Sequence, residues 1–180
     1  MKRIFPIRLV AAFALGMSLS TAGATQHMGL APAPAEELAP VLRFSIPRYV
    51  PTTLERETVA ACLVLEAASQ GVQGMRGVMA VIRNRARGEA VLFAPTVLRP
   101  KQFSAFNRIT SGRESLAQAI RRAQRDRTWL RALAIVEEAL DDSWTDPTWG
   151  ATHYTRSVEN TRWTRSLAKT VTIGAHSFYR

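Results

Sequence analysis

The sequence predicts an α+β fold in which helices come first and a small hairpin-like sheet closes the chain. Apolar residues recur at helical spacing from about residue 54 to about residue 140, and β-branched residues alternate in short runs after Gly150. The chain has 180 residues, of which 47% are hydrophobic. This length and composition predict one ordinary domain with a buried core.

The first 24 residues have the composition of a secretory signal peptide. Lys2 and Arg3 give a positive start, an apolar run follows over 9–19, and small residues surround Ala24. The run is shorter than the roughly 20 residues that a membrane helix needs. We therefore expect cleavage after Ala24, no transmembrane segment in the mature chain, and export to a periplasm or the cell exterior; a retained anchor is the alternative.

Residues 25–51 are predicted to form a Pro/Ala-rich linker, because proline at this density blocks regular helix and strand. The folded domain is expected over 52–180. Its first helix begins with a capping-box pattern from Thr52 to Glu55 and ends at 69–71.

Further helices are predicted over 74–87, 114–124 and 127–140, with Gly88 as a stop signal after the first of these. Residues 90–107 contain two prolines and are expected to be mostly loop. Glycines within the second helix would let the first helix approach closely.

The tail of the chain has strand character. Residues 152–155 and 169–173 are rich in β-branched side chains, and a polar turn region separates them. His153 and His176 both fall in this tail.

Cysteine and histidine usage excludes several classes of site. Cys62 is the single cysteine, so an internal disulfide and a Cys-rich zinc site are ruled out, and Cys62 is interpreted as a small core residue. The histidines of the tail together with Glu66 resemble a zinc site or an acid–base pair, but hydrogen-bonded structural histidines are the favoured interpretation. We expect no metal ion and no cofactor.

The charge balance favours anionic partners. The formal net charge is +10, and seven arginines lie between Arg108 and Arg131 against Glu114 and Asp126. Such a face attracts polyanions. Export argues against nucleic acid and favours anionic envelope polymers, while solvated helix faces remain the alternative.

Glu66 is the candidate for acid chemistry because its immediate neighbours in the sequence are all apolar. Apolar surroundings would favour the protonated form of a carboxyl group, which suits a general acid. From the helical spacing alone, a solvated surface glutamate is the favoured alternative.

Three ordered motifs resemble the SleB/CwlJ-type cell wall hydrolases, and together they span roughly residues 54–180. The residues that match are Glu66-Ala67, Gly74, Val78, Val81 and Asn84-Arg85 in the first motif, Gln102-Phe103-Ser104 in the second, and Tyr154, Trp163, Ile173-Gly174, His176 and Phe178 in the third. Many relatives carry a glutamate where this chain has Gln70 and a glycine where it has Ser69; we expect Gln70 to shape the turn and the groove.

The resemblance implies a peptidoglycan-cleaving enzyme with a mainly helical, lysozyme-like core related to the transglycosylases. It places Glu66 at the family's catalytic glutamate. The candidate substrate-binding residues are Gln102, Ser104, Tyr154, Trp163 and His176. For the two large aromatic residues, Tyr154 and Trp163, packing in the core is an equal alternative to stacking on sugar rings.

The expected reaction breaks the bond between N-acetylmuramic acid and N-acetylglucosamine. A hydrolase would need a second carboxylate, and none lies in the matched motifs, so a lytic transglycosylase with one glutamate is favoured. The alternatives are a zinc-dependent N-acetylmuramoyl-L-alanine amidase, or a binding module without catalysis.

Overall fold

The computed structural model describes residues 48–159 and 162–180. The predicted signal peptide and nearly all of the predicted linker lie outside the described residues, so their cleavage and export remain predictions. The helices are α1 (Thr53–Ala67), α2 (Gly71–Arg85), α3 (Phe93–Val97), α4 (Asn107–Thr110), α5 (Leu116–Gln124) and α6 (Trp129–Leu140), with short 3₁₀ helices η1 (Ala68–Gln70), η2 (Ala90–Leu92), η3 (Ser104–Phe106) and η4 (Arg162–Arg165). The strands are β1 (His153–Arg156), β2 (Lys169–Ile173) and β3 (His176–Tyr179).

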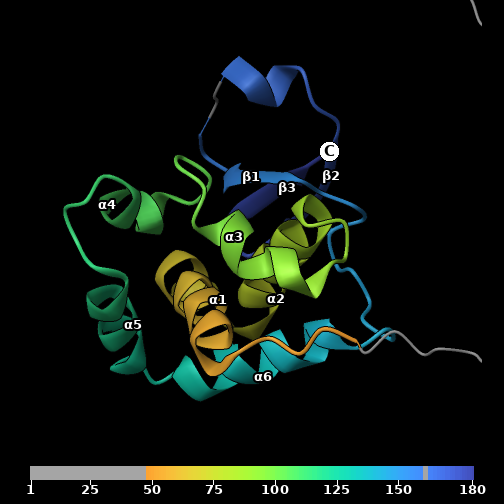
Figure 1. The fold of residues 1–180 in the computed structure, drawn as a ribbon. Coiled ribbons are helices and arrows are strands. Elements are labelled where there is room, and N and C mark those ends of the chain that lie inside the picture. The colour runs from red at the N-terminus through yellow and green to blue at the C-terminus, as the bar shows by residue number, and fades with distance from the viewer. Residues whose placement is uncertain (1–47, 160–161) are drawn as a thin grey trace, which may run out of the picture. The chain divides into compact units, whose positions relative to one another are not determined.

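Helix α1 lies at the centre of the helical layer and contacts α2, α3, α5 and α6 (Figure 1). Its start is the predicted capping box: the Thr52 hydroxyl accepts from the Glu55 amide at 3.3 Å, and the Glu55 carboxylate accepts from the Thr52 amide at 2.7 Å. Every residue from Thr58 to Val64 is buried. Neighbouring helices therefore cover α1 on several sides, which the helical spacing of its apolar residues did not predict.

The turn between α1 and α2 is tighter than the sequence predicted. The 3₁₀ helix η1 continues directly from α1, and Gly71, at φ +68°, begins α2 three residues before the predicted start. A positive φ of this size favours glycine. The predicted stop at Gly88 is confirmed: φ is +80°, and its amide donates to the Arg83 carbonyl at 2.9 Å.

The prediction that residues 90–107 are mostly loop is wrong in part, because α3 and two 3₁₀ helices occupy much of this region and α4 begins at its last residue. Pro95 lies within the first turn of α3. The amide that proline lacks has no intrahelical partner in a first turn, so a short helix tolerates it.

Within the described residues, the strands form one antiparallel sheet in the order β1-β3-β2. Tyr154 on β1 lies opposite Phe178 on β3, and Val171 on β2 lies opposite the same Phe178. The sequence predicted a hairpin-like sheet with strands at 152–155 and 169–173. The structure has a further strand, β3, which lies between these two. The fold class, a mainly helical α+β domain, is confirmed.

The sheet packs on α2 through Phe178, which is fully buried. A Cβ atom placed on Gly77 would come within 2.6 Å of the Phe178 Cζ atom, so only glycine leaves room for the ring. The expected role of this glycine was to admit α1; the structure shows instead that it admits β3. Among the described residues, no helix combines the length and apolar character that a membrane crossing requires.

Candidate active site

Glu66 lies in the last turn of α1 and is half-buried. Its Oε1 atom accepts hydrogen bonds from the Ala105 amide at 2.6 Å and from the Ser104 hydroxyl at 3.0 Å. Its Oε2 atom accepts from the Tyr154 hydroxyl at 2.7 Å. The expectation of purely apolar surroundings is therefore wrong: polar donors from two distant segments hold the carboxyl group in place.

Ser104 and Ala105 reach Glu66 because they form the start of η3. Phe103, directly before them, is buried in the core and anchors the loop. The first amides of a helix have no carbonyl partner within it, which leaves the Ala105 amide free to donate to Glu66. Sequence reasoning found Ser104 but missed Ala105, because a backbone donor has no residue-type signal.

Tyr154 points from β1 toward the helices. Its ring packs against those of Phe178 and His176, with centroid distances of 5.7 and 5.1 Å. Burial, and then the charge of Glu66, raise the pKa of Tyr154 well above its ordinary value. The phenol therefore keeps its proton across the neutral pH range and donates a hydrogen bond to Glu66.

His176 is buried beside Tyr154 on the same face of the sheet. Burial lowers the pKa of His176, and the charge of Glu66 opposes this effect in part. The ring is thus largely neutral at pH 7. Among the described residues, its buried Nδ1 atom has no hydrogen-bond partner.

Arg85, at the end of α2, forms hydrogen bonds with the segment before β1 and with the segment before η3. Its Nε atom donates to the Thr152 carbonyl at 2.7 Å, and its Nη1 atom donates to the Gln102 carbonyl at 3.2 Å. Its guanidinium also lies 5.1 Å from the centroid of the Phe103 ring. The side chain of Gln102 is exposed, so this residue contributes its backbone to the framework.

Gln70 joins η1 to the turn between β2 and β3. Its Oε1 atom accepts from the Ala175 amide at 2.7 Å, and a Cβ atom on Gly174 would lie 2.6 Å from the same oxygen. The turn expected for Gln70 was the one after Glu66, and the structure adds this contact with the turn between β2 and β3; its role in shaping a groove stays a prediction.

Trp163 is not brought to Glu66. It packs against His153 and Tyr179, with centroid distances of 5.5 and 5.4 Å. Since neighbouring residues on a strand face opposite sides, this cluster lies on the face of the sheet away from Tyr154. Figure 1 shows η4 on the side of the sheet opposite α1 and α2. The placement favours packing for Trp163.

The two tail histidines also lie on opposite faces of the sheet. His153 pairs with Tyr179, whereas His176 pairs with Arg156 at the other end of the same strand pair. An offset of three residues separates them by about 10 Å along the strands, which is too far for both to bind one metal ion. Among the described residues, no three candidate ligand side chains are close enough to hold a metal.

A cavity of about 400 Å³ opens beside Glu66. Its lining residues are Val64, Leu65, Glu66, Ala67, Ala68, Ser69, Arg122 and Asp126. In the sequence, Arg122 and Asp126 belonged only to the predicted basic face. Their spacing of four residues placed them on one side of α5 and its extension, but nothing in the sequence placed that side next to Glu66.

Cys62 is fully buried in the core, one turn before Glu66. Burial raises the pKa of its thiol well above the ordinary value. The thiol is unreactive in this state, as the sequence predicted.

Residues 69–179 match the protein family described as Cell Wall Hydrolase. The chain belongs to this family. It is therefore an enzyme that cleaves peptidoglycan, the polymer of the cell wall, and it acts on the cell envelope. Glu66 lies just before the matched region, so its role rests on the geometry described above.

A solved structure described as the catalytic domain of the germination-specific lytic transglycosylase SleB from Bacillus anthracis is similar to this chain. The TM-score is 0.54 at 22% sequence identity, and the match covers 73% of this chain and 100% of the other. At this identity the likeness concerns the fold, and it confirms the predicted lysozyme-like core. The chain matches no curated protein sequence.

Proposed function

We propose that this enzyme is a lytic transglycosylase that breaks the bond between N-acetylmuramic acid and N-acetylglucosamine, with Glu66 as its acid and base. The observation that carries the proposal is the set of three donors on the Glu66 carboxyl group, beside an open cavity. The similar structure of the SleB catalytic domain, a lytic transglycosylase by its description, supports the same reaction.

In the first step, Glu66 transfers its proton to the glycosidic oxygen, and the bond from that oxygen to C1 of the muramic residue breaks. The positive charge that develops on the sugar is oxocarbenium-like. Proton donation leaves Glu66 as a carboxylate. The donors from Ser104, Ala105 and Tyr154 stabilise that charge with groups already in place.

In the second step, the 6-hydroxyl oxygen of the same muramic residue attacks C1, and its proton passes to Glu66. The product carries a 1,6-anhydro ring, no water is consumed, and Glu66 regains its starting state. One carboxyl group serves both steps. The exposed residues of this region, Gln102 and Ser104, and the ring of His176 remain proposed substrate contacts.

The test is a digestion of peptidoglycan sacculi by the purified enzyme, with the products analysed by mass. We expect anhydro-muropeptides from the unaltered enzyme and a rate at least about a hundredfold lower in Glu66→Gln. Glu89→Gln, on the exposed surface after α2, is the matched control and should act normally.

Other results would point elsewhere. Reducing ends that contain one added water would contradict the transglycosylase and indicate a hydrolase in which Asp126, on the same cavity, activates water. Sacculus binding without any released fragment would indicate a binding module. Release of intact peptide stems would indicate an amidase, which the separation of His153 from His176 disfavours.

A further inference from the structure

Arg122 is a fixed positive charge on the cavity that contains Glu66. It lies on the last turns of α5, and its side chain is 47% exposed. The reaction proposed above gives this arginine no role, because the bond that breaks joins two uncharged N-acetyl sugar rings. Its position on the cavity that contains Glu66 therefore needs a different explanation.

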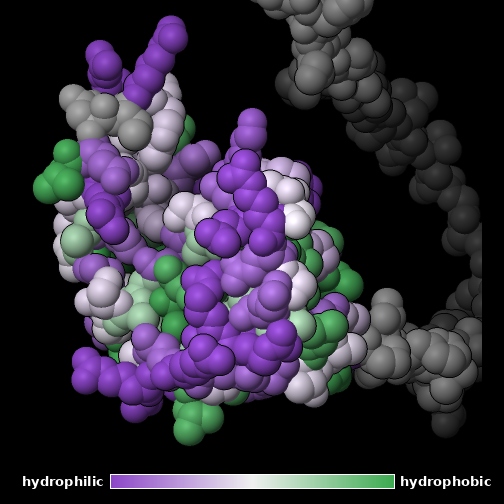
Figure 2. Space-filling view, turned by 90° about the vertical axis from the view of Figure 1, so that its left-hand side faces the viewer, coloured by the Kyte–Doolittle hydropathy of each residue, from purple (hydrophilic) through white to green (hydrophobic). Residues whose placement is uncertain are grey.

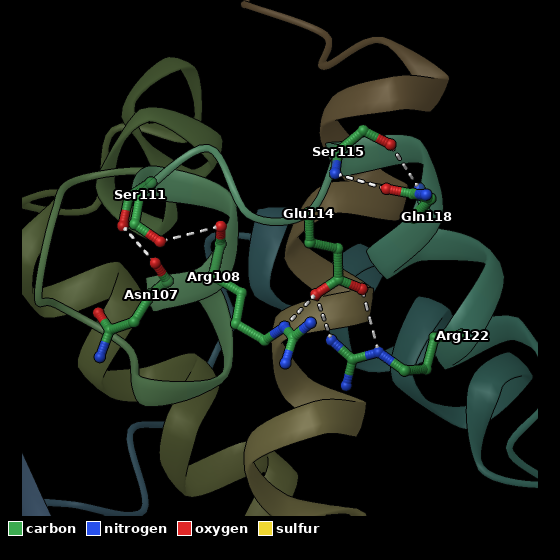
Figure 3. Close-up of polar contacts among 8 residues, drawn as sticks. Asn107, Arg108, Ser111, Glu114, Ser115, Gln118 and Arg122 are labelled. Atoms are coloured by element: carbon green, nitrogen blue, oxygen red, sulfur yellow. Dashed lines mark hydrogen bonds and ion pairs between the residues drawn. The ribbon is translucent and has the colours of Figure 1, made fainter.

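A nearly buried carboxylate holds Arg122 in place (Figure 3). The two oxygens of Glu114 accept from the Nε and Nη2 atoms of Arg122 at 3.2 and 3.0 Å. The side chain of Glu114 is only 12% exposed, and the Nε atom of Arg108 lies 3.7 Å from the same carboxylate. A guanidinium held in this way loses little conformational entropy when it binds a ligand.

The segment that carries Glu114 is itself well anchored. The amides of Arg113 and Glu114 donate to the Arg108 carbonyl at 2.8 and 3.2 Å. Directly after it, Ser115 and Gln118 form a capping box at the start of α5. Backbone hydrogen bonds therefore hold the Glu114 end of the contact, and α5 holds the Arg122 end, which fixes where the guanidinium lies.

Arg122 keeps binding capacity toward the cavity. Its Nη1 group takes no part in the two bonds to Glu114. One carboxylate, that of Glu114, faces the two guanidinium groups of Arg108 and Arg122. Among the described residues that line the cavity, Arg122 is the basic one, and it lies beside the acidic residues Glu66 and Asp126. Arginine binds carboxylates strongly through paired N–H groups. The ligand expected here is a carboxylate of the substrate.

On a peptidoglycan strand, the carboxylates belong to the peptide stems attached to the muramic residues, while the sugar rings are uncharged. We propose that Arg122 binds a carboxylate of the peptide stem next to the bond that is cut, and that Glu114 is a positioning residue for Arg122. The enzyme accordingly prefers peptide-bearing glycan over bare glycan. This inference rests on the proposed function, since it assumes that Glu66 marks the reacting bond.

The experiment compares two substrates: sacculi with intact stems, and glycan strands from which an amidase has removed the stems and whose freed lactyl carboxylates have then been capped as neutral methylamides. For each, kcat/KM for chain cleavage is measured by counting new chain ends of any chemical type. We expect kcat/KM of the unaltered enzyme to be about tenfold higher for the peptide-bearing substrate. This is the increase that one charge-assisted hydrogen bond to the substrate would give. In Arg122→Gln the ratio should fall to about one through a higher KM, with cleavage of bare strands unchanged.

Arg113→Gln is the matched control, because it removes the same charge from an exposed side chain next to Glu114 in the sequence. It should retain the substrate preference. Glu114→Gln should raise KM for the peptide-bearing substrate and leave bare strands unaffected. If Arg122→Gln does not fold, Arg122→Lys is used instead, because lysine keeps the positive charge but lacks the paired N–H groups of the guanidinium. In this variant the ratio of kcat/KM between the peptide-bearing and the bare substrate should fall severalfold.

The inference is wrong if the unaltered enzyme has no preference, if Arg122→Gln slows both substrates equally, or if Arg113→Gln acts like Arg122→Gln. These results are separate from a failure of the proposed function. The reaction type is decided by the chemistry of the new ends and by Glu66→Gln, whereas the role of Arg122 is decided by the ratio between substrates.

Discussion

At the scale of single residues, the site depends on donors that approach one carboxyl group from opposite sides. Ser104 and Ala105 come from the loop before α4, and Tyr154 comes from the sheet. Each oxygen of Glu66 is thus fixed by a different part of the fold. The orientation of the carboxyl group will change if either part moves.

Tyr154→Phe should lower kcat by about 10- to 100-fold, because it removes one hydrogen bond to a charged group. The fold should be retained, since the ring contacts with Phe178 and His176 do not involve the hydroxyl group. The measurements are steady-state cleavage of sacculi and thermal unfolding.

Tyr179→Phe is the control, because Tyr179 lies on the other face of the sheet with Trp163. It should cleave at a normal rate. Full activity in Tyr154→Phe would remove this hydroxyl from the proposed mechanism.

At the scale of elements, the active site needs the sheet to be docked closely on α2. Phe178 of β3 lies over Gly77, and Tyr154 is its neighbour across the strand pair. The contact between Gly77 and the Phe178 ring therefore also determines how far Tyr154 lies from Glu66. Stability and activity are coupled at this point of the fold.

Gly77→Ala should lower the free energy of unfolding by about 1–3 kcal/mol, because the added methyl group overlaps the Phe178 ring. It should also lower activity, since the sheet must shift away from α2. Denaturant unfolding and cleavage assays measure the two effects.

The double variant Gly77→Ala, Phe178→Leu tests the cause. The smaller side chain makes room for the methyl group, so the double variant should be more stable than the sum of the two single changes predicts. Strict additivity would show that overlap with Phe178 is not the reason.

At the scale of the whole molecule, basic side chains dominate the face that contains α4 and α5. Arg121 is exposed on α5, Arg125 is exposed at its end, and Arg131 is exposed near the start of α6. Figure 2 views the side of the molecule that carries α4 and α5 and shows many hydrophilic side chains across it. The formal net charge of the chain is +10. Long-range attraction to anionic envelope polymers is the proposed use of this charge.

Binding of the enzyme to sacculi should weaken about tenfold between 0.1 M and 1 M salt, because the screening length falls from about 10 Å to about 3 Å. Cleavage of short soluble glycan fragments should change much less. Pelleting assays and fragment turnover measure the two quantities.

The triple change of Arg121, Arg125 and Arg131 to Gln should weaken binding at low salt and reduce its salt dependence. The matched triple change to Lys keeps the charge and should bind normally. Salt-independent binding by the unaltered enzyme would show that the basic face does not contribute.

Much of the local structure could be predicted from the sequence. The capping box at Thr52 and the stop at Gly88 each depend on contacts within a few residues, which composition encodes directly. The position of Glu66 at the end of the first helix followed from the same periodicity. By contrast, the short helices within 90–107 were missed, because proline is compatible with a first turn.

The amino-acid sequence by itself determined the fold class, the four longer helices and the choice of Glu66 as the candidate, since these depend on short-range patterns and on the motifs of a family. Only the tertiary structure decided what surrounds that carboxyl group. It brought Tyr154 and Ser104 to it, left Trp163 on the other face of the sheet, and placed Arg122 on the same cavity. Such contacts join residues far apart in the chain, and their geometry depends on how helices and sheet pack, which no local pattern records.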